Sequence, residues 1–351
     1  MTTPRWQHRP EDSTWGDWGS DDQRGRMNLL TSEVRLRGMQ EVRTGEAFVL
    51  SMPLDYPKGS PLNPSRIAPI LRPSQRTETV VNYNTDLGKI QEGRPDVLSD
   101  DLVLMSLQYS TQWDSFAHVG ARFDVHGSGE TEMVYYNGYR AGVDIVATDK
   151  VEESGFRQGA EVVETSHAHA LGIEHLAQTP VQGPAVVIDL ERHFGPERRR
   201  IGYDEWMSVI EADGIEVQPG DMILIHTGYA EKIMENDGSV SAAELDGLGA
   251  LLDGSDERLR RWVTDSGVIA IIADTYSVEH YPAEITESNT SILPLHHHCL
   301  FKLGVHLGEL WRLTPLAMRL RELGRHRCLL TAPPLYLRGA VGSPVTPIAT
   351  L

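Results

Sequence analysis

The chain has 351 residues, of which 40% are hydrophobic and 23% are charged, and its formal net charge is −18. This composition excludes an intrinsically disordered chain, and the excess of negative charge argues against binding to a nucleic-acid phosphate backbone. Two cysteines are too few for a disulfide framework or a cysteine-based zinc site.

The N-terminus is polar, and no apolar run reaches the length of a membrane span. We therefore expect a cytoplasmic protein that has neither a leader peptide nor a membrane partner. Cys299 and Cys328 lie in apolar stretches, so we expect both to be buried free thiols.

Residues 1–100 are rich in Pro, Gly and Asn and show few regular patterns. Turn-forming residues dominate stretches such as 14–19 and 63–65. Such a segment cannot bury a core of its own, so we expect a long irregular N-terminal arm that wraps around the main domain or lines a cleft. Residues 101–351 then form the main domain, and the chain as a whole is one composite domain.

Four short apolar runs predict buried strands, at residues 185–190, 222–227, 268–274 and 327–330. Apolar residues at helical spacing predict helices over residues 203–210, 256–263 and 315–323. Strands that alternate with helices indicate an α/β fold. No glycine-rich phosphate motif follows any of these strands, so the sequence supports no nucleotide cofactor.

The stretch from Gln108 to His118 places metal-ligand side chains at spacings of four, two and four residues, at Gln108, Gln112, Asp114 and His118. Divalent cations bind where such nitrogen and oxygen donors converge. Asp114 and His118 would either share a metal or form an acid–base pair. The alternative is a polar turn with a hydrogen-bonded histidine, in which the two glutamines are ordinary residues of a half-buried strand.

A second polar cluster lies near the C-terminus, where three consecutive histidines, His296 to His298, precede Glu309. Consecutive side chains point in different directions, so at most two of these histidines face one site. His297 lies twelve residues before Glu309, and a return of the chain would bring both side chains to the first cluster. The alternative is a group of polar residues that flank a helix.

Two polar residues at strand ends are candidates for substrate binding. Asp274 ends the apolar run 268–274, and His226 lies at the end of another; α/β folds display site residues at such positions. Trp15, Trp18 and Trp113 are candidates for an aromatic wall against a planar substrate. The alternatives are a capped turn, a core histidine, and tryptophans that anchor the arm to the main domain.

Together these residues resemble the cyclase-type metal-dependent hydrolases, a family that includes bacterial kynurenine formamidase and isatin hydrolase. The family motif H-x-G-T-H-x-D-x-P-x-H aligns with residues 108–118, where Thr111, Asp114 and His118 match and Gln108, Ser110, Gln112 and Phe116 differ. The family's later histidine and glutamate align with His297 and Glu309, and its D-x-x-S-V-D/E segment matches Asp274, Ser277, Val278 and Glu279. The Trp-Gly-Asp-Trp-Gly stretch near the N-terminus is similar to a longer subgroup of this family.

The resemblance implies a swivelling β/β/α domain and a homodimer or homotetramer, and an arm without its own core fits exchange between subunits. It also implies one or two bound Mn or Zn ions, and our hypothesis for this chain is a single ion with a ligand set drawn from Gln112, Asp114, His118, His297 and Glu309. A glutamine carbonyl is a weaker zinc ligand than an imidazole. The two replaced histidines therefore make Mn at least as suitable as Zn.

The function that follows is a metal-dependent hydrolase of a small cyclic or aryl amide or lactone. A metal-activated water attacks the carbonyl and His118 removes its proton, with Asp114 and Glu309 as further catalytic residues. Two alternatives stay open. The replaced histidines also fit a metal-free cyclase or dehydratase of natural-product metabolism, in which Asp114 and His118 transfer protons, and a small-molecule binder without activity.

Overall fold

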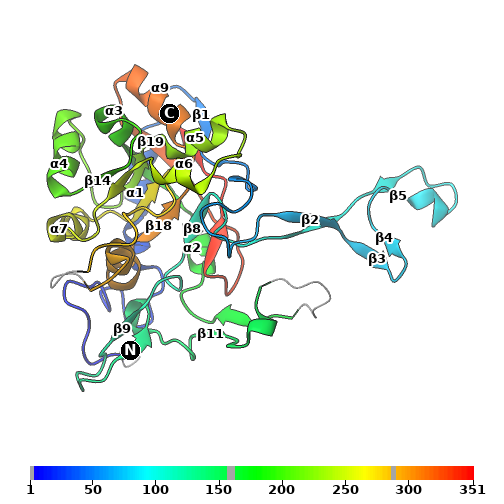
Figure 1. Cartoon of the computed structure of the whole chain (residues 1–351), viewed down its shortest axis with the longest axis horizontal. Helices are drawn as coiled ribbons and strands as arrows, with labels where there is room; N and C mark the ends of the chain where they lie inside the picture. Colours follow the sequence, from blue (N-terminus) through cyan, green and yellow to red (C-terminus); the bar gives the residue numbers. More distant parts are fainter. Residues whose placement is uncertain (1–3, 156–162, 286–289) are drawn as a thin grey trace.

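The computed structural model describes residues 4–155, 163–285 and 290–351. A nine-stranded sheet runs through the main body (Figure 1), in the order β1-β21-β19-β13-β15-β17-β18-β8-β20. Strands β13, β15, β17 and β18 are parallel to one another, and the other neighbouring pairs are antiparallel. The strands are, in this order, Ala47–Val49, Ile348–Thr350, Arg327–Thr331, Gln182–Asp189, Met222–His226, Ala270–Ala273, His306–Glu309, Gln112–Asp114 and Gly342–Pro344.

The four strands predicted from apolar runs are confirmed as β13, β15, β17 and β19. Helices α4 (Tyr203–Ala212) and α7 (Glu257–Ser266) contribute to the core on one face of the sheet, and α9 (Thr314–Leu323) contributes to the core on the other. Because both faces are covered, β17 and the central residues of β13 and β15 are apolar without alternation, and polar residues such as Asp189 and His226 stand at strand ends. All three predicted helices are confirmed, and with them the α/β fold; the swivelling β/β/α arrangement stays a prediction.

Two glycines account for the ends of two of these helices. Gly267 and Gly324 follow α7 and α9 in the left-handed conformation, with φ of 70° and 60°. Glycine adopts this conformation without the steric cost that a Cβ atom brings.

The remaining elements are short. The other α-helices are α1 Ser32–Met39, α2 Glu174–Gln178, α3 Leu190–Phe194, α5 Tyr229–Glu235, α6 Ala242–Asp246 and α8 Pro294–His296, the last continued by a π-helix, His297–Leu303. Single 3-10 turns lie at Gly25–Leu29, Leu87–Lys89, Tyr136–Gly138 and Val151–Glu153. Three small two-stranded sheets pair β9 Ala121–Phe123 with β10 Glu132–Val134, β11 Ile145–Ala147 with β12 Ser166–Ala168, and β14 Arg199–Ile201 with β16 Ala250–Leu252.

The first part of the chain lies against the main body. The Trp15 indole donates a hydrogen bond to the carbonyl of Phe301 at 2.7 Å, and β1 extends one edge of the large sheet. The segment before residue 68 is bonded to the segment that carries the Gln108–His118 stretch, since the Met52 amide donates to Thr111 Oγ1. The proposed domain boundary at residue 100 stays a prediction.

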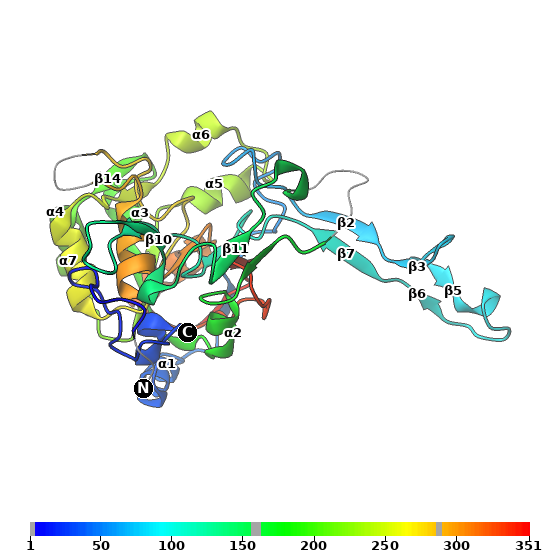
Figure 2. The same cartoon turned by 90° about the horizontal axis from the view of Figure 1, so that it is seen from below.

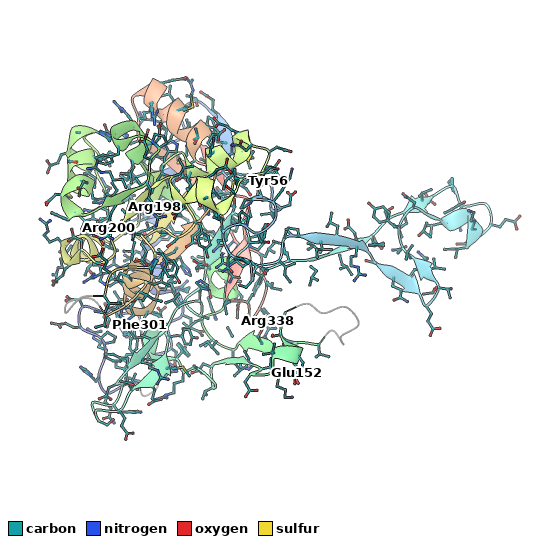
Figure 3. The ribbon with its side chains drawn as sticks, viewed as in Figure 1. Tyr56, Glu152, Arg198, Arg200, Phe301 and Arg338 are labelled. Atoms are coloured by element: carbon teal, nitrogen blue, oxygen red, sulfur yellow. The ribbon has the colours of Figure 1, made fainter. Side chains whose placement is uncertain are left out.

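Residues 70–104 form a ribbon that projects from the body in both views (Figures 1 and 2). It pairs β2 Ile70–Pro73 with β7 Asp101–Leu104, β3 Gln75–Thr77 with β4 Val80–Val81, and β5 Thr85–Asp86 with β6 Val97–Leu98. We call this ribbon the β-arm. In Figure 3 the side chains of the β-arm project to both sides of the ribbon. Its sequence does not predict strands, because the paired segments are short and are separated by Pro, Asn, Gly and Asp.

Cys299 and Cys328 are buried free thiols, as predicted. Across the described ranges, no helix combines the length and the apolar character that crossing a bilayer requires. The cytoplasmic location stays a prediction.

Candidate metal centre

Strand pairing brings the two polar clusters of the sequence together. Glu309 at the end of β18 lies directly opposite Gln112 on the antiparallel strand β8, and Asp114 follows two residues later. Because side chains alternate along a strand, Gln112, Asp114 and Glu309 point to the same face of the sheet. The Gln112 amide nitrogen donates to Asp114 Oδ1 at 3.1 Å and to Glu309 Oε2 at 3.3 Å.

A histidine from the far side of the site completes this group. His296 is the last residue of α8, and its Nε2 lies 3.3 Å from Glu309 Oε1. Its Nδ1 lies 2.7 Å from Glu279 Oε1. The Glu279 carboxylate also accepts the backbone N–H groups of Leu295 and His296, each at 2.8 Å, so it caps the start of this helix and orients the ring at once.

Two oxygens of this group are buried and have no hydrogen-bond partner, namely Gln112 Oε1 and Asp114 Oδ2. Ligand atoms of Asp114, His296 and Glu309 all lie within 4.8 Å of one another. Buried polar atoms normally find a partner, and an acceptor without a donor is satisfied by a cation or by water. The donor set of oxygens plus one imidazole nitrogen therefore fits a divalent metal with a preference for oxygen.

Burial and neighbouring charges shift the pKa values of the groups at this site. Burial raises the pKa of Asp114, and the nearby Glu309 adds to this effect while His118 opposes it. Burial also opposes ionisation of Glu309, but the hydrogen bond and charge of His296 outweigh it and lower the pKa of Glu309. Burial disfavours a charged His296, yet its bonds to Glu279 and Glu309 raise the pKa of His296 to about 10.

His118 stands at the solvent side of the group. Its Nε2 lies 3.9 Å from Asp114 Oδ1, and its side chain is 25% exposed whereas that of Asp114 is fully buried. Gln108, the other glutamine of the predicted motif, is half-buried, and a side chain at Gly342 would collide with its amide. The structure thus brings together Gln112, Asp114, His118 and Glu309.

The histidine run requires a correction, because His296 and not His297 faces this group. The His297 ring instead stacks on Phe301, with ring centroids 4.9 Å apart. Burial lowers the pKa of His297 to about 4. Successive helical residues point about 100° apart, so only one of the three faces the sheet. Glu279 bonds to both the backbone N–H and Nδ1 of His296 and so holds this ring toward Glu309, thirteen residues further along the chain.

The expected aromatic wall does not form, which is a second correction. Trp15 and Trp113 are fully buried in different cores, on opposite faces of the sheet. Trp113 packs edge-on against Trp311 and donates its indole N–H to the Ala332 carbonyl at 2.9 Å. Trp18 is half-buried in the N-terminal segment. The two buried tryptophans have no surface left for a substrate.

Asp274 and His226 also lie apart from the group around Asp114. Asp274 accepts hydrogen bonds from the amides of Thr227 and Gly228 and from the Thr227 hydroxyl, so it holds the turn after β15. His226 bonds to Asp189 through Nδ1 at 2.8 Å and to Thr314 through Nε2 at 2.9 Å. All these polar groups are occupied within the chain, so the structure does not place either residue in a substrate pocket.

Asp189, Glu191 and His226 form a second group with metal-ligand geometry. Here the Arg321 guanidinium bonds to both oxygens of Asp189 and to Glu191 Oε2 at 2.5 Å. We call this group the arginine-closed cluster, because a positive side chain already occupies the place that a cation would take.

Sequence reasoning missed two residues at the site. His296 was part of the histidine run, and only the orientation of the helix singles it out. Arg66 gave no signal, because it lies in an irregular segment far from either cluster in the sequence. In the structure its guanidinium donates to the Gln108 carbonyl at 2.5 Å and lies 5.4 Å from the ring centroid of Tyr276.

A family model described as putative cyclase matches residues 48–280, which is more than half of the chain. The chain therefore belongs to this cyclase family. A solved structure described as a novel cyclase is 29% identical, with 97% of this chain and 100% of that chain covered and a TM-score of 0.72.

Two isatin hydrolases share the fold at lower identity. The enzyme from Labrenzia aggregata bound to benzyl benzoate is 13% identical, with 91% of this chain and 98% of that chain covered and a TM-score of 0.53. An isatin hydrolase bound to the product analogue thioisatinate is 12% identical, with the same coverage and a TM-score of 0.51. No curated protein sequence is significantly similar to the chain.

Proposed function

We propose that this protein is a metal-dependent hydrolase of a small cyclic or aryl amide or lactone. The observation that carries the proposal is the pair of unpartnered buried oxygens on Gln112 and Asp114, beside Glu309 and His296. The fold shared with two isatin hydrolases supports the choice of a ring-opening or aryl substrate, at 13% and 12% identity.

Gln112 Oε1, Asp114, Glu309 and His296 Nε2 are the groups that would hold the metal. When bound, a divalent cation lowers the pKa of a water and polarises a carbonyl. Three of the four donors are oxygens, so Mn is at least as suitable as Zn. Glu279 fixes the His296 ring through Nδ1 and leaves Nε2 directed at Glu309.

His118 is the residue that would move protons. It is the member of the group with an exposed edge, so its Nε2 would take a proton at the site and release it to solvent. Asp114, 3.9 Å away, stabilises the imidazolium that results. With these roles for His118 and Asp114, proton transfer needs no other titratable group at the solvent side of the site.

The test is metal analysis of the purified protein, followed by assays on aryl formamides and aryl lactones. We expect about one bound metal, loss of turnover after chelation, and loss of at least about a hundredfold in turnover for Asp114→Ala and His118→Ala. His126→Ala, which removes an exposed histidine paired with Glu132, is the matched control. Full activity in both site variants, or after exhaustive chelation, would reject the proposal.

One observation favours a metal-free cyclase or dehydratase as the second candidate. The Gln112 amide bridges Asp114 and Glu309, and His296 bridges Glu279 and Glu309, so the site has internal donors for its carboxylates. Turnover that survives chelation but is lost in Asp114→Ala would select this function.

A further inference from the structure

Arg66 belongs to a segment that is fastened to the site. Its guanidinium donates to the Gln108 carbonyl at 2.5 Å, and the next residue, Ile67, donates its amide to Ser106 Oγ at 2.9 Å. The Tyr109 hydroxyl donates to the Pro57 carbonyl at 2.6 Å on the same segment. These bonds fix the guanidinium beside the residues that lead into β8.

The charge of Arg66 is not neutralised by an ion pair in the described part of the chain. Other half-buried arginines are paired: Arg312 bonds to Glu231, and Arg327 to Asp221 and Glu41. A guanidinium has five N–H donors, and the only protein acceptor seen for those of Arg66 within the described ranges is the Gln108 carbonyl. The side chain thus has free donors at the edge of the candidate metal centre, and its positive charge acts on Asp114, Glu309 and Tyr276.

A cavity of suitable size adjoins Arg66. A small hollow lined by Arg66, Asn63, Tyr109 and Tyr276 shares Asn63 and Tyr276 with a cavity of about 590 Å³. The larger cavity reaches Glu279, and its wall also includes Tyr229 and Tyr281. Its volume is in the range of small-molecule sites, and aromatic walls suit a ring-bearing ligand.

We infer that Arg66 binds an anionic group of the substrate, which is an aromatic or cyclic compound that carries a carboxylate. This inference rests on the proposed function for the reacting bond and adds the substrate class. A planar guanidinium matches a carboxylate with two parallel hydrogen bonds. The Tyr276 ring beneath it provides the surface on which the substrate ring packs.

The experiment measures binding, so that it does not depend on turnover. We would titrate chelator-treated protein with 2-naphthoate and with its neutral analogue 2-naphthamide by calorimetry. The wild-type protein is expected to bind the carboxylate at least tenfold more tightly than the amide. Arg66→Gln should abolish that preference, and Arg66→Lys should retain part of it because the charge remains.

Arg198→Gln is the matched control, since Arg198 lines the same larger cavity but is paired with Asp246 at 2.6 Å. The preference for the carboxylate should survive in this variant. The inference would be overturned if the preference for the carboxylate persisted in Arg66→Gln or were absent from the wild type. It would also be overturned if the preference appeared only after a metal is added. Loss of the proposed function would instead show as absent metal or chelator-resistant turnover, with the binding preference unaffected.

Discussion

The candidate metal centre and the arginine-closed cluster contain the same kinds of side chain, yet they differ in what balances their charge. Each has two carboxylates and a histidine with ligand atoms within 4.8 Å of one another. In the arginine-closed cluster, Arg321 bonds to both carboxylates. In the candidate metal centre, two buried oxygens remain without a donor. Proximity of ligand-type residues is therefore common to both groups, and the unpartnered oxygens are what favours metal binding at only one of them.

The largest effect expected from this comparison is on metal content. Asp114→Asn removes an anionic ligand, so bound metal should fall from about one equivalent to none and turnover by on the order of a thousandfold. Asp189→Asn in the arginine-closed cluster should leave metal content unchanged. Elemental analysis of both variants measures their metal content. Equal loss of metal in the two variants would contradict the distinction between the two groups.

The next effect is on stability and concerns Arg321. Arg321→Met leaves the buried Asp189 carboxylate without its cation, which should lower the free energy of unfolding by about 3 kcal/mol. Arg319→Met, which breaks pairs with the more exposed carboxylates of Glu46 and Glu322, should lower the free energy of unfolding much less. Denaturant titration measures both. Equal losses would mean that burial of the partner carboxylate, 6% exposed for Asp189 and 39% for Glu46, does not set the strength of these pairs.

Both groups should lose stability as the pH rises, since the pKa of His226 is also raised, and the contribution of the candidate metal centre can be measured through His296. In metal-stripped protein the protonated His296 side chain supplies the positive charge of the site, because the pKa of His296 is raised to about 10. A raised folded-state pKa contributes stability that is complete below about pH 6.5 and is lost as the pH rises through 10.

The wild-type protein should therefore lose roughly 2 kcal/mol of its stability advantage over His296→Gln between pH 7 and pH 9. Denaturant titrations of both chains at the two pH values give this difference directly. The comparison with the variant cancels other groups that titrate in this range. An advantage that stays constant would mean that His296 carries no proton at pH 7.

The sequence predicted the central strands because their residues are apolar without alternation, which is typical of parallel strands covered on both faces. It also predicted that Asp114 and Glu309 lie close together, because the motif at residues 108–118 and the spacing between the histidine run and Glu309 point to one shared site. It did not predict the β-arm, whose strands have no buried face and so show no alternation. Nor did it predict Arg66, whose place depends on how an irregular segment crosses the site.

The smallest effect separates neighbouring histidines and tests why the sequence pointed to the wrong one. His297 stacks on Phe301 with its ring away from the carboxylates, so His297→Asn should change metal affinity by less than about threefold. His296→Asn should abolish binding, because the nitrogen beside Glu309 is lost. Competition with a chelating dye measures both affinities. Residue spacing predicts that a histidine reaches Glu309, but the choice between adjacent positions depends on how Glu279 holds the start of the helix. A large effect at His297 would mean that the helix presents a different face to Glu309.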